Sequence, residues 1–222
     1  MGKSVDELKD KLMAFEIIVS EDWPKVGDGE EKWKEVKARR SNRKKEESFG
    51  EMFKHKPIDT VVVIGDSLTG GVGRKLEANS HMYTTKCMRG ARIEDVEREV
   101  GKLDGKEDRH LVLMAGTNNI KIEGSENIFK KYESLVKCSK TIKNRAVSVI
   151  GIPTRYDLDA VQNSRRLGMN SRVKKLCSKN DVQYIEFECG RSRLGRDGLH
   201  LNSIGQDEVA RMIFTHCKDF LV

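Results

Sequence analysis

Short segments far apart in the chain carry side chains that together could perform nucleophilic catalysis. The segment 65–68 (GDSL) follows an apolar run. A serine at such a strand-to-helix turn, here Ser67, would project its hydroxyl above a sheet, where the free N–H groups of the next helix face developing negative charge. Asp197 and His200 stand three residues apart, so one turn can present both, with the carboxylate holding the imidazole for proton transfer. These residue types predict a nucleophile, a base and a group that orients the base.

Two further segments offer donors that could stabilise an oxyanion. Gly90, in the segment 89–91 (RGA), lets a backbone N–H approach a ligand closely because it has no side chain. Asn118, in the segment 116–119 (GTNN), adds an amide. Each feature alone is weak, and Ser67 could equally be a helix N-cap. The whole set favours acyl transfer.

Two phosphate-binding motifs are excluded at the glycine-rich stretch that begins at residue 65. A Walker A loop requires Lys and then Ser or Thr after its last glycine, whereas Gly71 follows Gly70. A dinucleotide fingerprint requires a third glycine, whereas Gly71-Val72-Gly73 continues to Leu76. The catalytic interpretation of this turn therefore has no phosphate-binding rival.

The elements that must position these residues follow a regular alternation. Short apolar runs predict strands at 60–64, 82–87, 111–115, 146–152 and 182–187. Helical patterns lie between them at 70–79, 92–103, 125–143, 162–179 and 203–221. This alternation predicts a three-layer α/β/α domain with about five parallel strands, whose ligand site lies outside the carboxyl ends of the strands. The four segments above all follow strands or precede the last helix.

Spacing also predicts which helix faces and thiols are buried. In the segment 92–103 the buried face comprises Ile93, Val96, Val100 and Leu103. In the last helix the buried side comprises Ile204, Val209, Met212, Ile213 and Phe220. Cys87 and Cys189, near strand ends, are expected to be buried, inert thiols.

The first 56 residues differ in character from the rest. Val5, Leu8, Leu12 and Phe15 predict a short amphipathic helix over 4–15, which could support self-association. A polar arm follows, and its segment 32–45 carries eight Lys or Arg against one Glu. This segment is interpreted either as a solvated linker or as a contact for RNA or an anionic membrane. The basic residues are Lys32, Lys34, Lys37, Arg39, Arg40, Arg43, Lys44 and Lys45. We therefore expect an arm over 1–56 and a globular domain over 57–222.

Composition narrows the remaining classes. The 222 residues include 42 Lys and Arg against 35 Asp and Glu, a net charge of +7 that permits, without requiring, an anionic partner. The sequence contains neither an apolar stretch of membrane-spanning length nor the apolar core of a signal peptide. Five scattered cysteines without CxxC spacing indicate reduced thiols rather than a zinc site. We expect a cytoplasmic protein, not a secreted one, without a metal or organic cofactor.

Residues 60–221 resemble the SGNH (GDSL-type) hydrolase family, whose marker blocks carry Ser, Gly, Asn and His in that order. The matching blocks here are GDSL (65–68), Gly90, GTNN (116–119) and DGLH (197–200). The resemblance implies a flavodoxin-like fold, with Ser67 as nucleophile, His200 as general base and Asp197 orienting His200. It also implies an oxyanion hole formed by the N–H groups of Ser67 and Gly90 and the side chain of Asn118. One departure is Asn119, where the family often has Asp, so a structural interaction there is in question.

A narrower resemblance concerns the LINE retrotransposon proteins of the CR1/L2 type that append an SGNH esterase to a self-associating, RNA-binding region. The similar parts are VVVIGDSL, RGARIEDV, DGLHLNSIGQ and a basic lead-in with Trp33, Val36, Arg39, Arg40 and Arg43. This resemblance implies an esterase that is associated with RNA. Within the esterase class, we expect the substrate to be an acetyl or other short acyl ester of a lipid or a carbohydrate. The alternative is a catalytically weak module of the same fold that serves RNA or membrane association through the arm.

Overall fold

The computed structural model describes residues 60–105, 108–142, 144 and 146–220. The helix expected at 4–15 and the basic segment 32–45 lie outside these residues, so both stay predictions.

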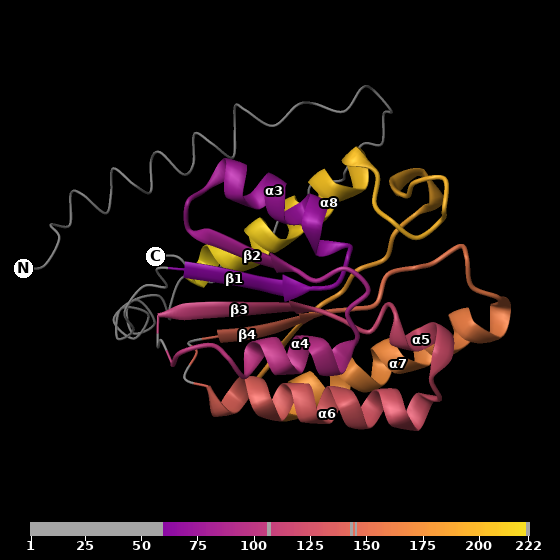
Figure 1. Cartoon of the computed structure of the whole chain (residues 1–222), viewed down its shortest axis with the longest axis horizontal. Helices are drawn as coiled ribbons and strands as arrows, with labels where there is room; N and C mark the ends of the chain where they lie inside the picture. Colours follow the sequence, from indigo (N-terminus) through magenta and orange to yellow (C-terminus); the bar gives the residue numbers. More distant parts are fainter. Residues whose placement is uncertain (1–59, 106–107, 143, 145, 221–222) are drawn as a thin grey trace, which may run out of the picture. The chain divides into compact units, whose positions relative to one another are not determined.

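A five-stranded, all-parallel sheet forms the centre of the described domain, with the strand order β2-β1-β3-β4-β5 (Figure 1). The strands are β1 (Thr60–Gly65), β2 (Tyr83–Cys87), β3 (Arg109–Met114), β4 (Ala146–Ile150) and β5 (Gln183–Ile185). Each strand starts within two residues of the start expected from the sequence, and β5 is half as long as expected. The predicted α/β class and parallel topology are confirmed.

Helices cover both faces of this sheet (Figure 1). One face carries α3 (Thr69–Asn79) and α8 (Ser203–Cys217), which pack against each other. The other face carries α4 (Ile93–Val100), α6 (Ser125–Thr141) and α7 (Ala160–Lys179), in contact in that order. Three short helices complete the described chain: α5 (Asn119–Ile122), η1 (Arg191–Arg193) and η2 (Lys218–Phe220). Neither α5 nor η1 was predicted, because four or three residues are too few to show a hydrophobic period.

Burial of β1 on both faces explains its unbroken apolar sequence. Val61 and Val63 belong to the core beneath α3 and α8, whereas Ile64 belongs to the core beneath α4, α6 and α7. All three side chains are at most 1% exposed. A strand buried on both faces has no solvent side and therefore no alternation of polar residues.

Two of the burial predictions are wrong. Ile204 is 51% exposed, because it lies in the first turn of α8 and turns away from the core that Val209 and Ile213 occupy. Cys87 is exposed, because β2 is an edge strand whose positions are mostly polar and exposed. The other residues expected on these helix faces are buried or partly buried. All five cysteines are free thiols.

Strand register brings the catalytic candidates to one edge. Gly65 at the end of β1 pairs with Cys87 of β2 and with Met114 of β3, which in turn pairs with Ile150 of β4. The loops that follow these four strands therefore start at the same level of the sheet.

None of the helices in the described part of the chain has the length and apolar composition of a membrane span.

Candidate active site

Ser67, His200 and Asp197 form a continuous hydrogen-bonded chain at this edge. His200 Nε2 lies 3.1 Å from Ser67 Oγ, and His200 Nδ1 lies 2.6 Å from Asp197 Oδ2. With the carboxylate accepting from Nδ1–H, the hydrogen-bond partners assign the tautomer that leaves Nε2 free to accept the serine proton. This is the geometry of a hydroxyl prepared for deprotonation.

The turn 197–200 holds its own carboxylate in place. Asp197 Oδ1 accepts the backbone N–H groups of Leu199 and His200, both at 3.0 Å, while its second oxygen holds the imidazole. The hydrogen bond from His200, with smaller help from the Leu199 N–H, lowers the pKa of Asp197 to about 2. Asp197 therefore stays ionised from pH 4 upward, and any loss of activity in that range belongs to another group. Gly198, at φ +68°, supplies the left-handed bend that the turn needs.

The strand-to-helix turn leaves Ser67 free for chemistry. The N-cap of α3 is Leu68, and it makes no side-chain capping bond, so Ser67 is not the cap. Asp66 supports the turn instead: its Oδ1 accepts the Leu68 N–H at 3.0 Å. Burial raises the pKa of Asp66, against the opposing effects of the Leu68 N–H, the Thr117 hydroxyl and the positive charge of Arg155. Through these contacts Asp66 braces the turn that carries Ser67.

Hydrogen bonds join the Gly90 segment to the Asn118 segment on one side and to the end of β1 on the other. Asn118 Nδ2 donates to the carbonyl oxygen of Ala91 at 2.8 Å, and the Met88 N–H donates to the carbonyl oxygen of Gly65 at 2.9 Å. Gly90 has φ +74°, in the region that favours glycine, and a Cβ there would meet nothing within 4 Å. The open space above Gly90 leaves its backbone accessible. An amide nitrogen carries two hydrogens, so the Ala91 bond fixes the Asn118 amide and leaves its second hydrogen for a ligand.

Asn119 makes the structural interaction that the sequence left in question. Its Oδ1 accepts the N–H of Ile93 at 3.0 Å, at the start of α4. Its Nδ2 donates to Glu123 at 2.7 Å and to Glu94 at 3.2 Å, and Lys131 bridges the same two glutamates at 2.7 and 2.8 Å. An aspartate could accept the first bond but would face two carboxylates. Asn is therefore the residue that suits these neighbours.

We expect Asn119→Asp to destabilise the domain by about 2–4 kcal/mol at neutral pH, because it buries a carboxylate against Glu94 and Glu123. That environment raises the pKa of the new carboxyl above its unfolded value. The variant is therefore most stable at low pH, where the new carboxyl is protonated. It loses stability as the pH rises through the pKa of this carboxyl in the folded protein. Urea unfolding at pH 5 and pH 8 measures both effects.

Adding Glu123→Gln to this variant provides the control. Removing one opposing charge should return part of the lost stability. An Asn119→Asp protein as stable as the wild type at pH 8 would contradict the account of this network.

Sequence reasoning missed the segment after β4. Arg155 and Tyr156 both contact candidate catalytic segments: Arg155 donates to the carbonyl oxygen of Thr117, and the Tyr156 N–H donates to the carbonyl oxygen of Gly198 at 2.9 Å. The order of residues in this loop matches no motif. The one available signal was its position after a central strand of a parallel sheet, where ligand sites gather.

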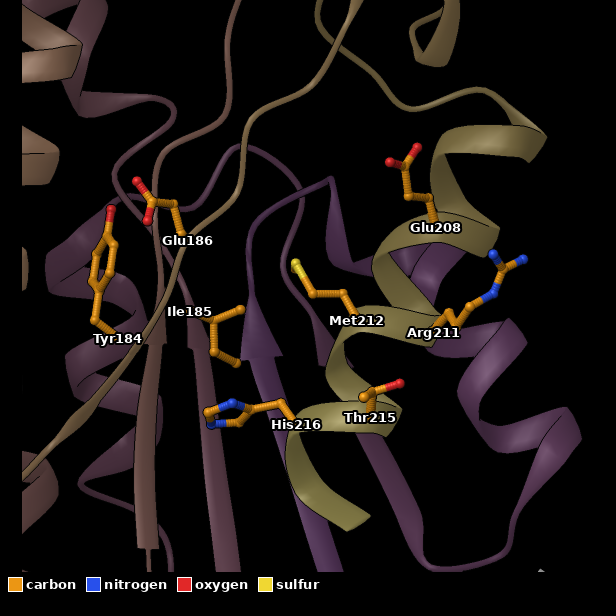
Figure 2. Close-up of a pocket in the computed structure, with 8 residues that line it drawn as sticks. All are labelled: Tyr184, Ile185, Glu186, Glu208, Arg211, Met212, Thr215 and His216. Carbon is orange, nitrogen blue, oxygen red and sulfur yellow. The ribbon is translucent and has the colours of Figure 1, made fainter. Parts of the chain in front are cut away.

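A groove of about 520 Å³ opens elsewhere, between β5 and one side of α8 (Figure 2). Its lining residues are Tyr184, Ile185, Glu186, Glu208, Arg211, Met212, Thr215 and His216. None of them belongs to the hydrogen-bonded chain of Ser67, His200 and Asp197. Two of its carboxylates are already paired, Glu186 with Lys174 at 3.2 Å and Glu208 with Arg193 at 2.8 Å. The groove is therefore not assigned to the catalytic site.

Solved structures share this fold. A member of the lipolytic G-D-S-L family from Veillonella parvula has a TM-score of 0.61 and 17% identity, covering 70% of this chain and 96% of its own. A variant of an acetylxylan esterase from Geobacillus stearothermophilus has 0.59 and 12%, covering 74% and 96%. The esterase EstA from Pseudoalteromonas, inhibited by monoethylphosphonate, has 0.60 and 14%, covering 73% and 98%. No curated protein matches the chain.

A parallel α/β/α sheet with a serine, a histidine and an aspartate joined at its carboxyl edge defines a hydrolase of the acyl-transfer class. The sequence pattern of the GDSL-like lipase/acylhydrolase family matches residues 63–207, which is more than half of the chain. The chain belongs to this family and is a carboxylic ester hydrolase.

Proposed function

We propose that the protein is a serine esterase in which Ser67 is the nucleophile, His200 the general base and Asp197 the group that orients His200. The observation that carries this proposal is the hydrogen-bonded chain from Ser67 Oγ through both nitrogens of His200 to Asp197. An ionised Asp197 stabilises the imidazolium that forms when His200 accepts the serine proton.

The reaction then follows two acyl-transfer steps. Ser67 Oγ bonds to the ester carbonyl carbon as His200 takes its proton, and the carbonyl oxygen becomes an oxyanion. The N–H groups of Ser67 and Gly90 and the free amide hydrogen of Asn118 are proposed to bind that oxyanion. The C–O bond breaks, and the alcohol leaves with the proton from His200. Water, deprotonated by His200, then attacks the acyl carbon. The bond from that carbon to Ser67 Oγ breaks, Oγ regains the proton from His200, and the acid is released.

The proposed substrate is an acetyl or other short acyl ester of a lipid or a carbohydrate. The side chains of His200 and Asp197 are each 50% exposed, which supports an open site rather than a deep acyl tunnel. The acetylxylan esterase among the structures of similar fold supports a small acyl group.

Two measurements test the esterase proposal. The wild-type protein should hydrolyse 4-nitrophenyl acetate, and longer acyl chains should be turned over progressively more slowly. A fluorophosphonate should label one serine stoichiometrically, and peptide mapping should place the label on Ser67; inhibition of EstA by a phosphonate supports this choice of probe. Labelling no faster than in heat-denatured protein would refute the proposal.

The arm before the domain gives the proposal its wider setting. The eight basic residues of the segment 32–45 support contact with RNA or an anionic membrane, and the helix expected at 4–15 supports self-association. Together with the blocks quoted above, they favour an esterase belonging to a LINE-type retrotransposon protein. If hydrolysis is absent while RNA binding persists, the alternative of a catalytically weak binding module is the better one.

A further inference from the structure

The guanidinium of Arg155 contacts the backbone that leads into Asn118. Its Nη1 donates to the carbonyl oxygen of Thr117, the peptide group that leads directly into Asn118. Its Nε and Nη2 form a two-pronged contact with Asp157, at 2.9 Å to Oδ1 and 2.7 Å to Oδ2. The side chain is only 4% exposed. The guanidinium is planar, and the Asp157 carboxylate holds one side of it, so the direction of the hydrogen bond from the other side is fixed. That bond therefore fixes the position of the Thr117 carbonyl group.

The same tripeptide, residues 155–157, also reaches the acid–base side of the site. The N–H of Tyr156 donates to the carbonyl oxygen of Gly198, inside the turn 197–200. The ring of Tyr156 lies 5.9 Å from the guanidinium of Arg191, which donates to the carbonyl oxygens of Gly195 at 2.6 Å and Arg196 at 3.1 Å. One short segment thus contacts both halves of the site.

We propose that Arg155 is a positioning residue of the esterase: it sets the Asn118 amide at the distance from Ser67 that the oxyanion requires, through its bond to the Thr117 carbonyl. This inference rests on the proposed function. A donor displaced by about 1 Å loses much of its effect on the transition state, and such displacements can cost up to about 100-fold in rate. Because Arg155 is buried and its hydrogen bonds go to Thr117 and Asp157, its effect is expected in kcat and not in substrate binding.

Arg166 provides a matched control for the loss of a buried arginine. It is also 4% exposed and also binds one backbone carbonyl and one carboxylate, the oxygen of Ile152 at 3.0 Å and Glu188 at 2.9 Å. Within the described part of the chain, these contacts of Arg166 involve neither the Asn118 segment nor the turn 197–200. Both variants lose an arginine side chain of the same size and burial. A difference in kcat between them therefore reflects the contacts that Arg155 makes at the site.

The kinetic test compares Arg155→Met, Arg155→Lys and Arg166→Met on 4-nitrophenyl acetate. Arg155→Met should lower kcat by about 10- to 100-fold with KM within about 3-fold, and Arg155→Lys should recover part of the loss by restoring one donor. Arg166→Met should change kcat by less than about 3-fold. In an Asn118→Ala background, Arg155→Met should cost less than about 3-fold, because the amide that it positions is gone. Equal losses in both arginine variants, or a full Arg155→Met effect without Asn118, would overturn the proposal.

A second readout does not depend on turnover. The Asn118 side-chain amide pair in a ¹H–¹⁵N spectrum, assigned by its absence in Asn118→Ala, should shift or broaden in Arg155→Met and stay in place in Arg166→Met. Unchanged Asn118 signals in a folded Arg155→Met protein would refute the positioning role, even if kcat fell. A wild-type protein no more active than Ser67→Ala would count against the proposed function alone, and the amide signals would still decide the role of Arg155.

Discussion

Replacing either Ser67 or His200 with alanine is expected to lower kcat for 4-nitrophenyl acetate by about 10⁴- to 10⁶-fold, and replacing both should cost no more than replacing one. The physical reason is that the hydroxyl and the imidazole perform one step between them, across the 3.1 Å that joins Ser67 Oγ to His200 Nε2. Without His200 the Ser67 hydroxyl has no base to accept its proton, and without Ser67 the imidazole has no nucleophile to deprotonate. Steady-state rates for the two single variants and the double variant measure this non-additivity.

Ser148 provides the control for this experiment. It also contacts imidazoles, with its Oγ 2.8 Å from His110 Nε2 and 3.0 Å from His216 Nε2. Its side chain is fully buried on β4, so no ester can reach it. Ser148→Ala should therefore keep kcat within a few-fold of the wild type. Losses for Ser67→Ala and His200→Ala that multiply in the double variant would show that the two residues act independently, against the proposed mechanism.

The meeting of the candidate segments at one edge could be predicted because the topology of a parallel sheet turns sequence order into spatial order. Each of the segments 65–68, 89–91 and 116–119 directly follows a strand, and parallel strands deliver their following loops to the same edge. The spacing of Asp197 and His200 is a local property of one turn. Neither inference needed knowledge of side-chain packing, which is why both agree with the structure.

The supporting contacts could not be predicted, because they depend on which loops meet. The Glu94 and Glu123 carboxylates that suit Asn119 come from α4 and from the residue that ends α5, and no local pattern links them. Arg155 contacts Thr117 across 38 positions of sequence. Helical periodicity likewise placed Ile204 on the buried side, although the first turn of α8 extends past the core. Periodicity gives the buried face of a helix but not where the underlying sheet ends.

Asn118→Ala is the other substitution for which we expect a large effect, a loss of about 100- to 1000-fold in kcat with little change in KM. The carbonyl oxygen of a bound ester is nearly neutral, and it accepts strongly from the amide only when it becomes an oxyanion in the transition state. The bond from Asn118 Nδ2 to the Ala91 carbonyl at 2.8 Å holds the amide plane before substrate arrives, so the donor needs no reorganisation during the reaction. Phosphonylation of Ser67 should slow in parallel, because the phosphonate oxygen takes the same position.

Asn170→Ala separates this catalytic effect from the loss of a structural amide. Asn170 donates its Nδ2 to the carbonyl oxygen of Ile152 at 2.9 Å and accepts the N–H of the same residue, so its removal also leaves a backbone group unpaired. Its variant should lose stability while kcat stays within about 3-fold of the wild type, since removal of a hydrogen bond distant from the reacting atoms acts on ground state and transition state alike. Equal falls in kcat for the two variants would mean that Asn118 serves only to join its loop to Ala91. A rise in KM with kcat unchanged for Asn118→Ala would mean that the amide binds the ester itself in the ground state, and the oxyanion would then depend on the backbone N–H groups of Ser67 and Gly90.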